Sequence, residues 1–127
     1  MASSATKFLC LFLILGLASP SLATVVYKVG GDILGWNEGV NLNAWASDKD
    51  FKVGDVLEFN YLPLVHNVAR MADENAFVNC ITDQNLIIDA SGSTSVVLNQ
   101  VGDLFFTSSV LTDCVSNLKM KVSVKSS

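Results

Sequence analysis

Very few side chains of this 127-residue chain could do chemistry. It contains one histidine, His66, within the sequence LVHNV. A serine hydrolase needs such a histidine beside a serine and an acid, and no nucleophile motif of that kind accompanies it. The glycines Gly30, Gly31 and Gly35 match no nucleotide fingerprint, and no other glycine-rich phosphate loop is present. We therefore predict that the protein is not an enzyme.

The cysteines predict a secreted domain with one disulfide. Residues 1–23 hold a short apolar run, FLCLFLILGLA, followed by small residues, which is typical of a signal peptide cleaved after Ala23. Cleavage would remove Cys10 and leave Cys80 and Cys114, which in a small secreted domain most simply form one bridge. Closing a loop of about 35 residues should contribute roughly 3–4 kcal/mol in the chain-entropy model. No cysteine then remains as a nucleophile or as a metal ligand.

Residues 24–127 are predicted to form one small domain. The whole chain has a formal net charge of −4, and loss of Lys7 with the leader makes the domain more acidic. An acidic domain without a basic cluster excludes nucleic acid and anionic membranes as expected partners. No apolar tail follows Lys125, so no stable membrane anchor is expected.

Alternating apolar and polar residues predict an all-β fold. The clearest two-residue period runs from Leu118 to Lys125, and a second one covers Val56–Tyr61. Short helical segments are expected within 35–50 and 72–80. Ser95–Leu98 and Leu104–Thr107 flank a turn-like sequence and are predicted to form a hairpin. Two further strands are expected at Val25–Val29 and Val65–Met71. Several short strands at such spacing favour a sandwich or a barrel.

A series of motifs then gives the chain a family resemblance. These are VYKVGG with GW, WASDKDFKVGDVLEFNY, LVHNV, the isolated Cys80, and GDLFF leading into DCVSNLK. In order and spacing they resemble the phytocyanins, the plant family of secreted cupredoxins. The nearest branch looks like the early nodulin-like or plantacyanin-like proteins. The resemblance implies a cupredoxin-like Greek-key β-sandwich of two sheets, with a Cys80–Cys114 bridge near the metal-binding end.

The same resemblance identifies the positions of a copper site. Copper-binding members use an upstream histidine, a cysteine thiolate, a second histidine and an axial Met or Gln. Those positions are His66, Ser108, Asp113 and Leu118 here, so one ligand of four remains. A serine hydroxyl cannot replace the short copper–thiolate bond, and a carboxylate suits Mg, Ca or Mn better than copper. The resemblance therefore implies that the copper site has been lost and that no metal is expected.

Each remaining candidate residue has two interpretations. His66 is predicted to pack at a sheet end against backbone or water, and Asp113 to be a solvated loop acid. The alternative is weak metal binding by these two residues. Val110, Leu111 and Leu118 are expected to form an apolar patch at the vacated site, where an interaction could occur. Four aromatic side chains could stack on a sugar or peptide, but core packing is favoured: Trp36, Trp45, Tyr61 and Phe77.

The sequence thus predicts a secreted phytocyanin-like domain without a cofactor, located in the apoplast. We expect it to act as a non-redox interaction or structural module of the plant cell wall. Its partner would be an extracellular protein or a cell-wall glycan. The alternative is a blue-copper electron transfer protein that binds copper, as in the copper-binding phytocyanins.

Overall fold

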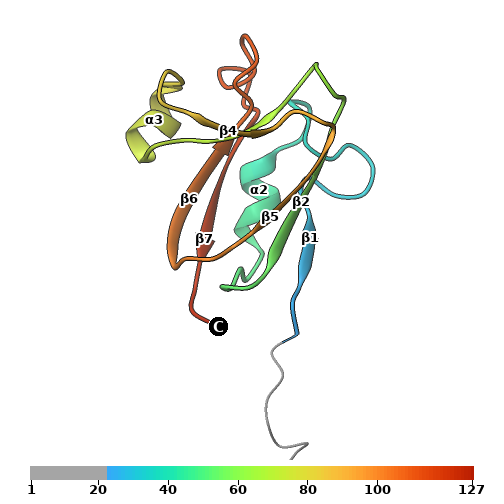
Figure 1. The fold of residues 1–127 in the computed structure, drawn as a ribbon, viewed down its shortest axis with the longest axis vertical. Helices are drawn as coiled ribbons and strands as arrows, with labels where there is room; N and C mark the ends of the chain where they lie inside the picture. Colours follow the sequence, from blue (N-terminus) through green and yellow to red (C-terminus); the bar gives the residue numbers. More distant parts are fainter. Residues whose placement is uncertain (1–22) are drawn as a thin grey trace, which may run out of the picture.

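The computed structural model describes residues 23–127, which fold into two facing β-sheets (Figure 1). The first sheet has the strand order β1-β2-β5 and the second has the order β4-β3-β6-β7. Strand β1 is parallel to β2, and all other strand pairs are antiparallel. The strands are β1 (Val26–Lys28), β2 (Val56–Asn60), β3 (Val68–Arg70), β4 (Leu86–Asp89), β5 (Ser93–Val97), β6 (Gly102–Thr107) and β7 (Lys119–Val124).

Two short helices complete the described fold. Helix α2 (Leu42–Ser47) packs against β7, and α3 (Glu74–Asn79) packs against β6. The residue that caps the start of each helix is Asn41 for α2 and Asp73 for α3. Its side chain accepts a hydrogen bond from a backbone N–H in the first turn of the helix. Both helices lie within the two segments where the sequence predicted short helical pieces.

The core lies between the two sheets and follows the alternation seen in the sequence. On β7, Met120, Val122 and Val124 are buried, whereas Lys121 and Ser123 between them are more exposed. Trp36 is fully buried, contacts Phe59 edge to face, and donates its indole N–H to a backbone carbonyl. The other three aromatic side chains considered above are partly buried against core clusters, so the prediction of core packing is confirmed.

The structure confirms the two-sheet β fold and corrects two details of it. Strand β4 was not predicted. Strands β5 and β6 do not form a hairpin, because β5 pairs with β2 in the first sheet and β6 pairs with β3 and β7 in the second. The predicted signal peptide lies outside the described residues except for Ala23. Within residues 23–127, no helix is long and apolar enough to cross a bilayer.

Candidate functional site

Strand pairing brings two distant segments together at one end of the second sheet. In the antiparallel pair β3–β6, Ala69 lies opposite Thr107. The residues just before β3 therefore meet those just after β6. His66 belongs to the first segment and Ser108 to the second. Between them, the backbone N–H of Asn67 donates a 3.1 Å hydrogen bond to Ser108 Oγ.

A third residue, Asp113, joins this pair from the loop between β6 and β7. Its Oδ2 accepts a 2.6 Å hydrogen bond from Ser108 Oγ and lies 2.8 Å from His66 Nδ1. All three residues are buried, with exposed fractions of 1% for Ser108, 4% for His66 and 9% for Asp113. A carboxylate only accepts hydrogen bonds, so Nδ1 carries the hydrogen in this contact. The three side chains form a continuous polar network centred on Asp113, which we call the Ser108–Asp113–His66 network.

Backbone turns fix Asp113 within its loop. Its N–H donates to Val110 O at 2.9 Å, and its own carbonyl accepts from Leu118 N at 2.9 Å. Leu118, at the expected axial position, is fully buried, and its carbonyl accepts from Ser108 N at 3.2 Å. The loop is therefore closed across its base by backbone hydrogen bonds, which places the carboxylate next to the end of β6.

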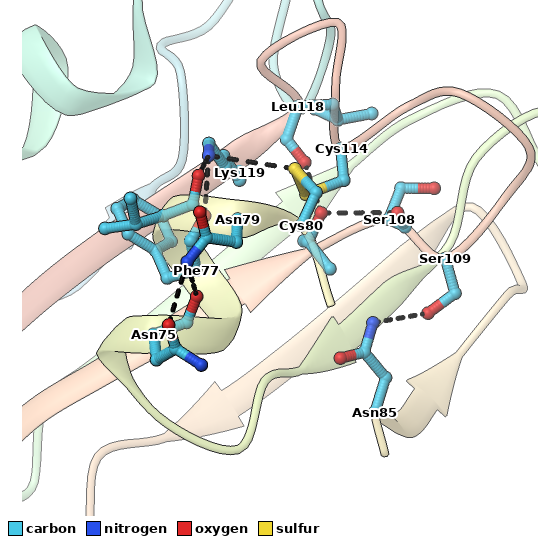
Figure 2. The surroundings of a disulfide bond; sticks show 12 residues. Asn75, Phe77, Asn79, Cys80, Asn85, Ser108, Ser109, Cys114, Leu118 and Lys119 are labelled. Carbon is cyan, nitrogen blue, oxygen red and sulfur yellow. Dashed lines mark hydrogen bonds between the residues drawn. A yellow bond between two sulfur atoms is a disulfide. The ribbon is translucent and has the colours of Figure 1, made fainter. Parts of the chain in front are cut away.

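The disulfide attaches the same loop to α3, the helix that packs against β6 of the second sheet. Cys114, next to Asp113, is bonded to Cys80 at the end of α3, as predicted (Figure 2). Lys119 reinforces this junction, since its Nζ donates to Phe77 O at 2.6 Å and lies 4.8 Å from the centre of the Phe77 ring. The loop that carries Asp113 is thus attached to the end of α3 by the disulfide, and the ammonium group of Lys119 stabilises the same junction.

The structure brings together all four positions identified from the sequence, but it changes the role of two. Asp113 is buried and hydrogen-bonded, so its interpretation as a solvated loop acid is wrong. His66 packs at the sheet end as predicted, and its Nδ1 contacts the Asp113 carboxylate rather than a backbone group. The expected apolar patch is also incomplete: Leu118 is in the core, whereas Leu111 is 96% exposed. Sequence reasoning missed the network because its members lie up to 47 residues apart.

The network contains the residue types of a hydrolase triad in the wrong order. In such a triad the imidazole lies between the serine and the acid and accepts the serine proton. Here the carboxylate lies in the centre, and Ser108 donates to Asp113 rather than to His66. Ser108 is also almost completely buried. The arrangement therefore provides no activated nucleophile.

The residues present do not fit a blue-copper centre. Such a centre requires a thiolate with two imidazoles, and the equivalent positions hold a hydroxyl and a carboxylate. Both cysteines of the described residues are bonded to each other. The one cluster in this part of the chain that could hold a metal ion consists of Glu38, His66 and Asp113, whose candidate ligand atoms lie within 4.8 Å of one another.

A two-sheet sandwich with a disulfide beside the loop before its last strand has the architecture of a cupredoxin. The plastocyanin-like domain family matches residues 36–118, and the chain belongs to this family, within the phytocyanins. A blue copper protein of Pisum sativum is 38% identical over 128 residues, which cover 100% of this chain and 66% of the pea protein. The early nodulin-like protein 22 of Arabidopsis thaliana is 32% identical over 90% of this chain and 79% of its own length.

The solved structures agree with the sequence relatives. Cucumber basic protein, a blue copper protein, superposes with a TM-score of 0.70 at 32% identity, covering 80% of this chain and 100% of the cucumber chain. The chain spans between about half and two thirds of the length of two curated relatives, the pea protein and uclacyanin-3 of Arabidopsis thaliana. These matches establish the family of the domain. They do not extend to this chain the activity of the longer proteins.

Proposed function

We propose that this chain is a secreted, non-enzymatic phytocyanin domain that works without copper, as an interaction or structural module outside the cell. The Ser108–Asp113–His66 network is the observation that carries the proposal. The carboxylate of Asp113 accepts hydrogen bonds from the hydroxyl of Ser108, which stands at the thiolate position, and from the imidazole of His66. The side chains at three of the four expected ligand positions are therefore joined by hydrogen bonds.

Two physical reasons support the loss of redox function. A copper–thiolate bond needs a sulfur ligand, and a protonated serine hydroxyl is a hard and weak donor in its place. A metal at this position would also have to displace two short hydrogen bonds to Asp113. Hydrogen bonds to a charged group contribute about 1.5–3 kcal/mol each, so the network resists opening.

An interaction role is supported by the loops at the same end of the sandwich. Leu64 is 88% exposed and Leu111 is 96% exposed, and both have positive φ angles, of 67° and 42°. A left-handed backbone is unfavourable by about 1–2 kcal/mol for a residue that carries a Cβ atom. These two loops thus hold large apolar side chains in solvent in an unfavourable conformation, which favours contact with an extracellular protein or a wall glycan.

Copper addition tests the proposal directly. Disulfide-bonded protein beginning at Thr24, titrated with Cu(II), should show no intense blue thiolate band and no reversible one-electron couple. The cucumber basic blue protein serves as the positive control under the same conditions. A saturable blue centre at one copper per chain would establish the alternative, blue-copper electron transfer, and overturn this proposal.

A further inference from the structure

The imidazole of His66 has a second nitrogen that the network leaves free. Its Nδ1 hydrogen is directed at Asp113, so in the neutral ring Nε2 carries a lone pair. The charged group nearest to Nε2 is the carboxylate of Glu38, with Oε2 at 3.8 Å. When the ring is neutral, two acceptors thus face each other at the edge of a buried ring, at a distance too long for a hydrogen bond.

We propose that this pair is a binding site for a borderline divalent cation such as Zn²⁺. Zinc binds imidazole nitrogen at about 2.0–2.1 Å and carboxylate oxygen at about 2.0–2.2 Å, so in its usual tetrahedral geometry two ligand atoms of one ion lie about 3.3–3.5 Å apart. The 3.8 Å between Nε2 and Oε2 is longer by about 0.3–0.5 Å, a gap that the half-exposed Glu38 side chain can close by a small rotation. The proposed ligands are His66 Nε2 and Glu38, and water completes the coordination shell from the solvent side.

The surroundings of both ligands support this assignment. A metal-bound histidine characteristically donates its other ring N–H to a carboxylate, which orients the ring and makes the ligating nitrogen more basic. Asp113 makes this contact to His66 Nδ1 at 2.8 Å, and it in turn accepts from Ser108. Asp113 is therefore a positioning residue. It fixes the imidazole so that Nε2 points away from the network and toward Glu38.

Glu38 is held on a short, well-defined turn. The side chain of Asn37 accepts a 2.8 Å hydrogen bond from Gly39 N, and its carbonyl accepts from Val40 N at 3.1 Å. The preceding Trp36 is locked in the core. The Glu38 side chain is 49% exposed, so a cation can reach it from solvent.

The cation class follows from the donor set. One imidazole nitrogen and carboxylate oxygen suit Zn²⁺, whereas Ca²⁺ and Mg²⁺ prefer sites made of oxygen alone. Zn²⁺ has no redox chemistry, so such a site is compatible with a non-redox domain. It differs from the lost copper centre, because it uses the ring nitrogen that faces away from Ser108 and Asp113.

The experiment is a Zn²⁺ titration of the disulfide-bonded domain by calorimetry, with Ca²⁺ present in excess. We expect saturable binding at one Zn²⁺ per chain. The variant Glu38→Gln should bind at least about tenfold more weakly, since even outer-shell changes cost about 10–100-fold in metal affinity. The control Glu58→Gln makes the same change of charge on β2 and should bind like the wild type. Circular dichroism verifies that both variants are folded.

The nitrogen that binds can be identified, because the chain contains a single histidine. In ¹⁵N-labelled protein, Zn²⁺ should shift the Nε2 resonance of His66 while Nδ1 retains its hydrogen. The proposal is overturned by absent or non-saturable binding, by equal affinity in Glu38→Gln and wild type, or by a metal-bound Nδ1. A blue copper centre would refute the proposed function without affecting this result, so the two failures are distinguishable.

Discussion

Removing the hydroxyl of Ser108 should destabilise the fold. The variant Ser108→Ala deletes one oxygen that makes two buried hydrogen bonds and a longer, partly buried one from Val110 N at 3.4 Å. This oxygen donates to Asp113 Oδ2 at 2.6 Å and accepts from Asn67 N at 3.1 Å. Ser108 is only 1% exposed, so water has little access to replace it.

The expected magnitude follows from those two bonds. The Asn67 amide would be left buried without its acceptor, which costs about 1–3 kcal/mol, and the Asp113 carboxylate would lose a charge-assisted bond, which costs about 1.5–3 kcal/mol. Partial relaxation of the loop makes the two losses less than additive. We therefore expect the free energy of unfolding to fall by about 2–4 kcal/mol. For a domain of this size that lowers Tm by about 10–25 °C.

Urea unfolding at pH 7 with the disulfide intact measures this loss. The matched control is Ser123→Ala, because Ser123 also donates to an aspartate, Asp103 Oδ1 at 2.7 Å, but on the exposed surface. That change should stay within about 0.5 kcal/mol of wild type. If Ser108→Ala is no more destabilising than the control, the network does not stabilise the fold and the reasoning fails.

Three further predictions follow from the same structure. Reduction of the disulfide should lower the free energy of unfolding by roughly 3–4 kcal/mol, and denatured, unreduced mature protein should show no free thiol by titration. Hydrogen bonds from the hydroxyls of Ser91 and then Thr94 hold the pKa of Asp89 below its ordinary value. The stabilising contribution of Asp89 should therefore be complete above about pH 5 and be lost as the pH falls through that lowered pKa. When the pH is lowered, the urea midpoint of Asp89→Asn should decrease less than that of the wild type. Equal decreases in the two proteins would contradict the assignment. The double variant Ser108→Cys with Asp113→His should bind copper with a blue thiolate band, and neither single variant should; a correctly bridged double variant that stays colourless would show that the loop geometry has changed.

The strands that could be predicted from the sequence are those with one buried and one exposed face. Strand β7 alternates between core residues and the polar residues Lys119, Lys121 and Ser123, so its period of two is visible in the sequence. Strand β4 lacks that signal, because Leu86, Ile87 and Ile88 are all at least 39% exposed. It is a strand because it pairs with β3. This pairing depends on distant residues that a local pattern does not contain.

The predicted hairpin failed for a related reason. A turn-like sequence separates the segments of β5 and β6, and local rules favour pairing across such a turn. Instead, Leu98 is fully buried, with backbone hydrogen bonds to Asp55 and Gly54 of the segment before β2. The chain therefore leaves the first sheet there and enters the second. Tertiary contacts, rather than turn chemistry, decide where the chain continues.

At the site, the family resemblance identified the positions and could not give their interactions. Side-chain type alone made Asp113 look like a loop acid, because aspartates are mostly exposed. A buried carboxylate is stable only where donors compensate its lost hydration. Those donors come from Ser108 and His66, which are 5 and 47 residues away in sequence. Their convergence is a property of the fold.

The network also explains why a copper site would be difficult to regain one residue at a time. Asp113 is the shared acceptor of two donors, so Asp113→His alone would leave the Ser108 hydroxyl and the His66 ring N–H without their carboxylate. Ser108→Cys alone would replace a strong donor with a weak one and lose the acceptor of the Asn67 amide. Each single step breaks buried hydrogen bonds before any metal–ligand bond compensates for them. The hydrogen bonds from Ser108 and His66 to Asp113 thus join three segments of this chain without requiring a metal ion.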